Sequence, residues 1–398
     1  MSKVRGSVHD AKMIAYGGEV TDLRHCRPRL SFDSRGKGGI QGTPTMIIRT
    51  LLLASTAALS MTAGARAADA IVAAEPEAME YVRVCDAFGE GFFYIPGTET
   101  CLKIGGYVRN DNNLGESAYS GEDLDWSPFT RGTLTLDARN DTEFGELRSF
   151  IEMRSEASDG ESTTYINSAY IMLGGFMAGF NDSRYDLFLN SAGNIINDDV
   201  IDYTGDRTNQ VSYQWGGDKG FSAFIGVEEG GGSYDTGFAG RPVDDYQAAH
   251  PLAGARIQED WGGLFIIGGY DPDAEAFGGK VRGDIVFNDV FKIFIMAGYQ
   301  SDWNNDKGPG DTRRRNYYGP WNGDWAAWGG FTATVNEKTS VNGQVAYEQD
   351  GTLATALNME YMIVDNFKVQ PEFNYTKFDG ERGHGDAVGG TIRFQRDF

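Results

Sequence analysis

The stretch AVGGTIRFQRDF, residues 387–398, carries the pattern that decides the fold. Apolar residues and a glycine take the even positions Val388, Gly390, Ile392, Phe394 and Phe398, whereas polar residues take the odd positions Thr391, Arg393, Gln395 and Asp397. A β-strand places alternate side chains on opposite faces. The segment therefore predicts a strand with one apolar and one polar face.

The same alternation recurs along the chain. It is clear in residues 102–111, 131–139, 210–215 and 341–348. In a soluble sandwich the apolar face would pack against a second sheet, whereas in a membrane barrel it would contact lipid and the other face would line water. The alternation alone leaves both folds open.

The lengths of the connections favour the barrel. Short turns are predicted at 140–145, 216–220, 288–290, 336–339 and 364–366, and long polar loops at 112–129, 181–207, 229–250, 302–324 and 377–386, with shorter loops near 157–164, 271–276 and 349–352. Eight loops and seven turns connect sixteen strands, and that number leaves an aqueous channel. No run of about 18 apolar residues follows residue 67, as a membrane helix would need. The predicted fold class is an all-β, 16-stranded antiparallel transmembrane β-barrel with short periplasmic turns and long external loops.

Residues 46–67 have the features of an export signal. Arg49 precedes an apolar stretch, 51–61, which is followed by Ala65-Arg66-Ala67, an A-x-A cleavage pattern. We predict a signal peptide at 46–67 and a β-barrel chain at 68–398, with an N-terminal segment to residue 101 and barrel strands at 102–398. Residues 1–45 are predicted to be an N-terminal extension that results from a wrongly assigned start codon. A buried or membrane helix at 51–61 fits less well, because the stretch is too short to span a bilayer.

Charge and cysteine content narrow the class further. The chain has 57 acidic and 35 basic residues, and residues 68–398 carry a net charge of −28. This excess argues against a nucleic-acid partner, which needs a basic surface. Cys85 and Cys101 remain after cleavage, and in an oxidising compartment they predict a disulfide, with two unpaired buried thiols as the alternative. No cofactor or metal is predicted.

Two other functions have weaker support in the sequence. An outer-membrane barrel with hydrolase activity needs a nucleophile and a base, yet only His250 and His384 remain after cleavage and neither lies in a catalytic motif. A secreted β-sandwich adhesin would suit the aspartate-rich loops, but Asp271 and Asp273 are not followed by a calcium-loop pattern. The chain is therefore predicted not to be an enzyme.

Two stretches resemble a known family. CDAFGEGFFYIPGTETCLKIGGYVRND, residues 85–111, and AYIMLGGFMAGFNDSRYDLF, residues 169–188, resemble alphaproteobacterial general porins of the Brucella and Rhizobium type. The resemblance covers residues 46–398. It implies a homotrimer of sixteen-stranded barrels in the bacterial outer membrane, in contact with lipid and lipopolysaccharide, and an inward-folded third loop. The implied function is passive diffusion of ions and small hydrophilic solutes through a water-filled channel.

The residues that would carry this function form two groups of opposite charge. The polar face of the early predicted strands carries a group of basic side chains, called the basic wall, which consists of Lys103, Arg109, Arg131, Arg139, Arg148 and Arg154. The third loop supplies the acids Asp182, Asp186, Asp198, Asp199 and Asp202. Acids facing bases across a constriction would create a transverse field that selects solutes by charge and size. The alternative for each aspartate is a solvated position on an exposed loop.

Some further residues are candidates for contact with the membrane. Trp261, Trp325, Trp328 and Tyr347 lie near predicted strand ends, as in aromatic girdles. Residues 313–315 are three arginines in a long loop, where they either bind lipopolysaccharide phosphates or are simply solvated.

Overall fold

The computed structural model describes residues 83–203, 205–230, 248–301, 303 and 316–398. The N-terminal extension, the signal peptide, its cleavage after Ala67 and the arginines at 313–315 lie outside these residues and stay predictions. Within the described part of the chain, no helix is long and apolar enough to cross a membrane.

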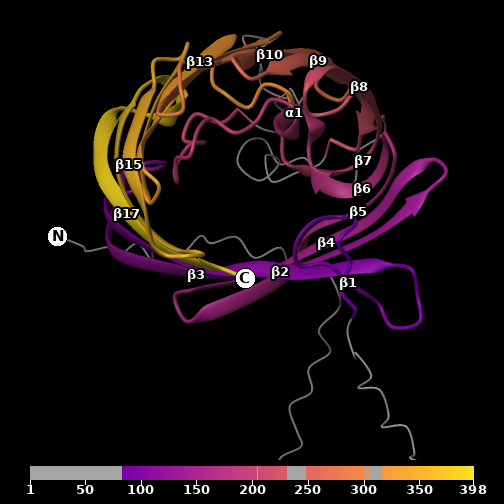
Figure 1. The fold of residues 1–398 in the computed structure, drawn as a ribbon. Helices are drawn as coiled ribbons and strands as arrows, with labels where there is room; N and C mark the ends of the chain where they lie inside the picture. The colour runs from indigo at the N-terminus through magenta and orange to yellow at the C-terminus, as the bar shows by residue number, and fades with distance from the viewer. Residues whose placement is uncertain (1–82, 204, 231–247, 302, 304–315) are drawn as a thin grey trace, which may run out of the picture. The chain divides into compact units, whose positions relative to one another are not determined.

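Sixteen antiparallel strands, β2 to β17, form one closed barrel (Figure 1). The first eight are β2 (Cys101–Glu116), β3 (Asp123–Thr142), β4 (Gly145–Ser158), β5 (Glu161–Leu173), β6 (Phe176–Asp182), β7 (Arg207–Trp215), β8 (Gly220–Glu228) and β9 (His250–Glu259). The others are β10 (Gly262–Asp271), β11 (Ala276–Val286), β12 (Phe291–Gln300), β13 (Trp325–Asn336), β14 (Thr339–Glu348), β15 (Leu353–Val364), β16 (Phe367–Phe378) and β17 (Gly385–Asp397). The barrel closes where β17 pairs with β2, from Gly389 opposite Gly115 to Asp397 opposite Tyr107. The predicted sixteen-stranded antiparallel barrel is confirmed.

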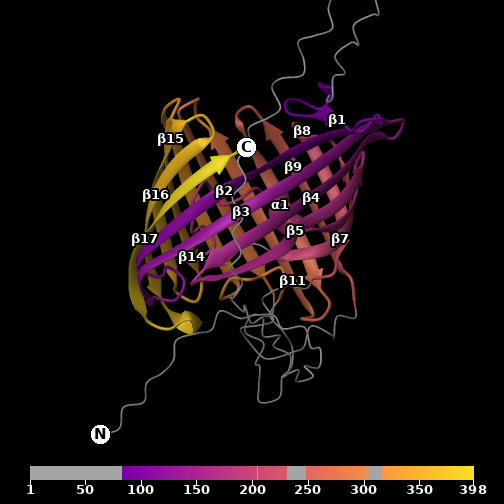
Figure 2. The same ribbon diagram turned by 90° about the horizontal axis from the view of Figure 1, so that it is seen from below.

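Loops and turns lie at opposite ends of the tilted strands (Figure 2). The third loop at the loop end of the barrel, residues 183–206 between β6 and β7, is called loop 3 below, and it contains the helix α1 (Arg184–Leu187). A short 3-10 helix, η3 (Gly380–Arg382), lies in the last loop.

The predicted first loop at 112–129 is wrong. β2 continues to Glu116 and β3 begins at Asp123, so the loop contains only residues 117–122. The polar side chains that suggested a loop instead bond between the two strands. The indole of Trp126 donates to Asn112 at 3.1 Å, and the amide of Asn113 donates to the carbonyl of Ser127 at 3.1 Å. The predicted loop at 157–164 likewise contracts to two residues between Ser158 and Glu161.

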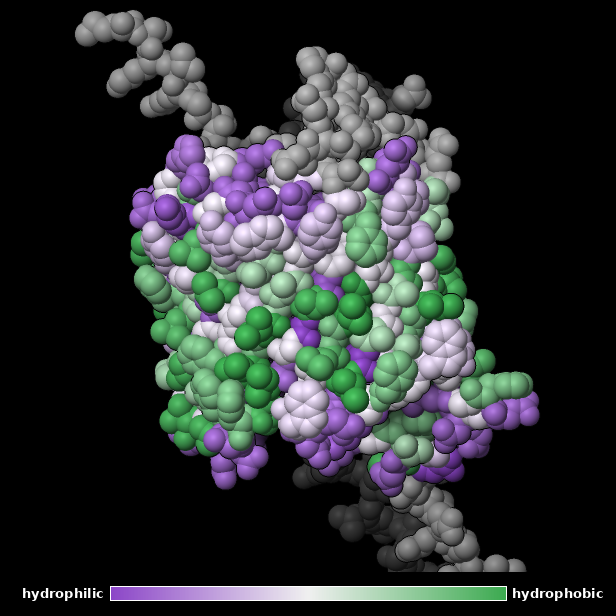
Figure 3. All heavy atoms as spheres, turned by 90° about the horizontal axis from the view of Figure 1, so that it is seen from above, coloured by the Kyte–Doolittle hydropathy of each residue, from purple (hydrophilic) through white to green (hydrophobic). Residues whose placement is uncertain are grey.

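The outer face of the barrel is largely apolar. Figure 3 shows a band of apolar side chains between more polar rims, on the side of the barrel that includes β10. In β10 the outward Leu264 and Ile266 are 57% and 56% exposed. Trp261, Trp325 and Tyr347 are also exposed. Trp328 does not belong to an outer girdle, because its side chain points inward, is 2% exposed and donates to the carbonyl of Ile201 at 2.8 Å.

Part of the barrel interior is an apolar core. In β10 and β12 the inward residues Phe265, Ile267, Phe294 and Met296 are buried. They pack with loop 3 and with residues 317–321 of the sixth loop in one cluster. Both faces of these strands are therefore apolar, because one contacts the exterior and the other contacts folded loops.

A disulfide fixes the N-terminal segment to the barrel. Cys85 and Cys101 are bonded, with a Cα–Cα distance of 5.9 Å. The strand β1 (Phe93–Tyr94) pairs with the start of β2, beyond the end of β17. β1 thereby covers a part of the β2 edge that would otherwise be unpaired.

Replacing Cys101 with Ser is expected to loosen residues 85–100 without opening the barrel. Closing a loop of this length stabilises by about 3 kcal/mol in the chain-entropy model, and the barrel itself closes through β17 and β2. Limited proteolysis should then cut within 85–100 much faster, while the folded barrel keeps its mobility on a gel run without heating. A cleavage rate equal to that of the unmodified protein would contradict this expectation.

Candidate functional site

The structure divides the six predicted basic residues into two levels. Arg109 lies directly opposite Arg131 in the register of β2 and β3, and Arg154 pairs with Thr133, two residues from Arg131. We call Arg109, Arg131 and Arg154 the middle cluster. Lys103, Arg139 and Arg148 form the lower cluster, nearer the turn end of the barrel. Arg131 and Arg139 are eight residues apart on β3, about 26 Å at the usual rise of a strand.

Carboxylates lie among these arginines. The closest pairs are Arg131 with Glu156 at 2.5 Å, Arg154 with Glu152 at 2.7 Å, and Asp137 with Arg139 at 2.7 Å and Arg148 at 2.8 Å. The wall is therefore mixed in charge rather than purely basic. Lys103 serves another purpose, because its ammonium donates to the carbonyl of Glu90 in the N-terminal segment at 3.0 Å.

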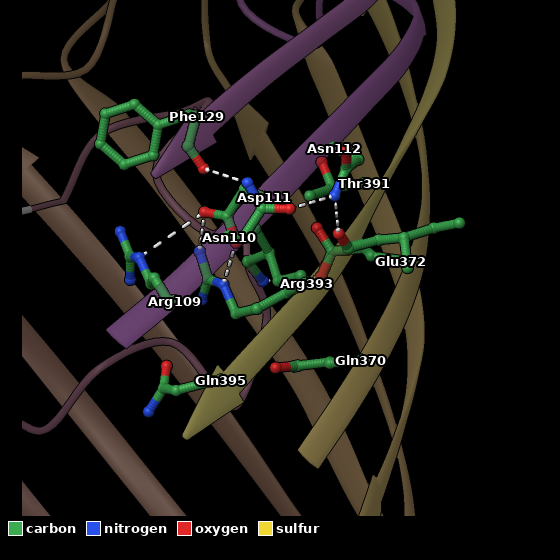
Figure 4. A network of polar contacts seen from close by, with 12 residues as sticks. Arg109, Asn110, Asp111, Asn112, Phe129, Gln370, Glu372, Thr391, Arg393 and Gln395 are labelled. Atoms are coloured by element: carbon green, nitrogen blue, oxygen red, sulfur yellow. Dashed lines mark hydrogen bonds and ion pairs between the residues drawn. The ribbon is translucent and has the colours of Figure 1, made fainter. Parts of the chain in front are cut away.

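Arg109 is the least compensated member of the middle cluster (Figure 4). Its nearest carboxylate is Asp111, at 3.6 Å. Asp111 already accepts two hydrogen bonds from Arg393, at 2.7 and 2.8 Å. The Nε of Arg109 has no hydrogen-bond partner among the described residues. Like charges directly opposite each other destabilise a sheet, so the Arg109–Arg131 pair has a cost that folding alone does not explain.

Sequence reasoning missed several members of this wall. They are Asp111, Glu152, Glu156, Arg207 and Arg393. Arg393 was placed on the polar face of its strand, but only closure of the barrel brings β17 beside β2. Arg207 was counted with the third loop, whereas it begins β7 and donates to Asn167 at 2.8 Å.

Loop 3 leaves the wall early and folds into the barrel (Figure 1). β6 has only seven residues, ending at Asp182. Ser183 then caps α1, since its hydroxyl accepts from the backbone N–H of Tyr185. Tyr185, Phe188, Leu189 and Ile201 bury themselves in the internal apolar core.

Polar side chains on the inner wall hold loop 3 by its carbonyl groups. The donors come from five strands, and the bonds are Arg282 to Asn190 and Ser191, Gln344 to Ala192 and Asp198, Asn358 and Gln370 to Asn194, Trp328 to Ile201, and Lys280 to Tyr203. The loop is therefore fixed against β11–β16, on the side of the barrel away from β3 and β4 (Figure 1).

The predicted loop acids occupy different environments. Asp182 is the last residue of β6, where it pairs with Arg207 and interacts electrostatically with Arg154. Asp199 is exposed, and its carboxylate accepts from the Tyr119 hydroxyl of the first loop at 2.5 Å. Asp198 accepts from the Tyr203 hydroxyl at 2.5 Å. Asp186 and Asp202 instead interact with Lys280, on the wall side of the loop.

Asp198 gives the site an expected pH dependence. Burial between loop and wall, with the neighbouring Asp199 charge, raises the pKa of Asp198 from 3.8 to about 7. Below this pKa the carboxyl is neutral, so the ratio of cation to anion passage through the barrel should fall as the pH drops from 8 to 6. Because the folded pKa is raised, this group favours the folded loop at low pH, and that contribution is lost as the pH rises through about 7. Reversal potentials that stay constant over this range, or that move toward cations at low pH, would contradict the assignment.

Comparisons with known proteins agree with this architecture. A family model described as "Porin subfamily" matches residues 69–395. The chain is 41% identical over 373 residues to Porin Omp2b of Brucella suis, covering 89% of this chain and 100% of that protein. It is 42% identical, at the same coverage, to Porin Omp2b of Brucella neotomae.

Solved structures share the fold at low sequence identity. The outer membrane channel DcaP of Acinetobacter baumannii superimposes with a TM-score of 0.55 at 14% identity, covering 77% of this chain and 99% of that one. A mutant porin of Rh. blastica gives 0.52 at 12% identity, covering 75% and 100%. With the family match over most of its length, the chain belongs to the porin subfamily and is an outer-membrane β-barrel porin of the alphaproteobacterial general porin type.

Proposed function

We propose that the channel selects ions and small hydrophilic solutes at mid-height, between the middle cluster and loop 3. The observation that carries this proposal is the course of loop 3, which is bonded to β11–β16 and leaves the arginines of β2–β4 across the lumen. Charged groups lining a narrow passage select by sign and by size. Asp198 and Asp199 then supply the acidic side of the constriction, and Arg109, Arg131 and Arg154 the basic side. Asp182 adds a carboxylate at the end of β6, on the wall close to Arg154 and Arg207.

No catalytic step is part of this proposal. His250, a candidate base for a hydrolase, is fully buried, and its Nε2 lies 3.5 Å from Asp271 and from Asp273. Its ring also packs on Tyr317 and Tyr318. These contacts join the ends of β9 and β10 to the sixth loop, which supports a structural role for His250.

Single-channel recording of the 68–398 chain in a planar bilayer under a salt gradient tests the function. Stepwise ohmic openings are expected, and the reversal potential gives the charge preference. A folded, inserted barrel that conducts no ions would overturn the proposal. Release of hydrolysis products from an acyl ester, lost on replacing His250, would favour the enzymatic alternative instead.

We further propose that the outer face of β2–β5 is covered by a second copy of the chain, as in a homotrimer. Asn110, Asn112 and Thr130 share the outward parity of the exposed Val108 and Leu114. Their side chains form a hydrogen-bonded row, from Asn112 to Asn110 at 2.6 Å and from Asn110 to Thr130 at 2.9 Å. Lipid tails cannot hydrogen-bond to the remaining donors and acceptors of these amide groups, whereas polar groups on a protein surface can.

Replacing Asn110 and Asn112 with Leu distinguishes a surface covered by a second copy of the chain from one that faces lipid. Between copies of the chain, the change is expected to remove polar contacts and shift the detergent-purified protein from trimer toward monomer. Facing lipid, the same change would raise thermal stability and leave the oligomer unchanged, because amides are costly in a bilayer. Light scattering coupled to size-exclusion chromatography gives the mass, and Leu357→Val on the exposed outer face of β15 is the control.

A further inference from the structure

Glu372 is an unusual group on the inner wall. It projects inward from β16, next to Gln370 on the same face of the strand (Figure 4), and it is 5% exposed. Four donors converge on its carboxylate. Oε2 accepts from the backbone N–H of Ile196 at 2.6 Å and from Asn358 at 2.9 Å, and Oε1 accepts from the backbone N–H and the side-chain amide of Asn197, both at 2.9 Å.

Three of these four donors belong to loop 3. Among the described residues, the other wall contacts of the loop apex run in the opposite sense, with a wall side chain donating to a loop carbonyl. The exception is the side-chain amide of Asn194, which donates to Glu360 at 3.3 Å. Glu372 is therefore the group that satisfies the backbone N–H groups at the apex. A buried N–H without an acceptor costs free energy comparable to a lost hydrogen bond.

The contacts require a carboxylate rather than an amide. Both oxygens of Glu372 act as double acceptors, whereas a glutamine has one acceptor oxygen and an NH₂ group that would face two further donors. No ion pair of Glu372 is found among the described residues, so the charge is balanced by hydrogen bonds to the loop and to Asn358.

The position of this contact connects it to the constriction. Asn197 is followed directly by Asp198 and Asp199, the two acids placed nearest the apex. Among the described residues, the first loop adds one bond to these acids, from the Tyr119 hydroxyl to Asp199. A shift of residues 196–197 away from the wall would move both carboxylates.

We propose that Glu372 is a positioning residue that sets the width and charge placement of the pore by holding residues 196–197 against β16. The inference rests on the proposed function, because it concerns the same constriction. Its effect is on the mean position and the mobility of the loop acids, and Glu372 need not touch a solute.

The test compares Glu372→Gln with Glu360→Gln in single-channel recordings of the full 68–398 chain. Glu360 is an inward acid on the neighbouring strand, and its main partner is the ammonium of Lys368 at 2.8 Å. Both variants remove one negative charge, but only the first removes an acceptor of the backbone N–H groups of residues 196–197, because Glu360 contacts the apex through the side chain of Asn194 alone and a glutamine there can still accept that bond. Glu372→Gln is expected to raise open-channel current noise about twofold or more and to admit larger neutral sugars, while Glu360→Gln changes ion preference alone.

Asn197→Asp tests the same contact from the loop side. The new carboxylate replaces a hydrogen-bond donor with a negative charge beside Glu372, so this variant should also raise current noise. It leaves the barrel wall unchanged, and it therefore still tests the contact if Glu372→Gln fails to fold. Noise and sugar exclusion equal to wild type in both variants would overturn the role of Glu372. Absence of conductance in the wild-type protein would overturn the proposed function itself, so the two failures are distinguishable.

Discussion

Replacing Arg109, Arg131 and Arg154 together with Gln is expected to raise the ratio of cation to anion permeability by about threefold or more. These three residues face the lumen at one level and are partly exposed. Their removal leaves Glu152 and Glu156 without their arginine partners, so the wall becomes acidic. The reversal potential under a tenfold salt gradient measures the change, and it should move toward the equilibrium potential of the cation.

The lower cluster provides the matched control. Arg139→Gln with Arg148→Gln removes two basic charges from the inner wall instead of three. They lie about 26 Å along β3 from Arg131 and about 20 Å along β4 from Arg154, well beyond a Debye length of about 8 Å in physiological salt. A much smaller shift is expected there. Equal shifts from the two sets would mean that overall lumen charge decides selectivity, and the middle cluster would lose its special place.

The fold was predictable because its main signals are local. Alternation marks the strands, and glycine-rich turns alternate with long polar loops along the chain. The error at 112–129 has a physical cause, since side-chain amides of Asn112 and Asn113 bond between neighbouring strands. A sequence read one segment at a time cannot distinguish such amides from loop residues. β10 and β12 depart from the alternation in the opposite way, because they carry apolar residues on the inner face as well. Those residues pack against loop 3, which lies far away in the sequence, so the strands alone do not explain them.

The site was predictable only in part. The parity of β2, β3 and β4 assigns the arginines to the polar face of each strand, because parity is a property of each strand alone. Which arginines share a level depends on register, and register separates Arg131 from Arg139. The anchors of loop 3, among them Gln344, Asn358 and Glu372, look like ordinary lumen-facing polar residues in the sequence. Only the bonds to residues 192–198 reveal their purpose.

Replacing Asp182, Asp198 and Asp199 together with Asn should shift the ion preference in the opposite direction, toward anions, by a similar factor of about threefold. Asparagine has nearly the same shape and still accepts a hydrogen bond, so the contacts with Tyr119 and Tyr203 can persist. Asp186→Asn is the control, because Asp186 interacts with Lys280 on the wall side of the loop. An unchanged reversal potential would show that the three acids are solvated loop residues and do not line the constriction.

Combining the two triple replacements distinguishes a transverse field from a simple balance of charge. The combined variant has the same net charge as the wild type, so its ion preference should return close to the original value. Its field across the constriction is nevertheless altered, because the three arginines and the three aspartates are neutral while Glu152 and Glu156 on the wall keep their charges. Passage of a zwitterionic amino acid relative to a neutral sugar of equal size should therefore change, as measured by liposome swelling. A ratio equal to that of the wild type would mean that the two sets of charges act independently and that no oriented field contributes to selection.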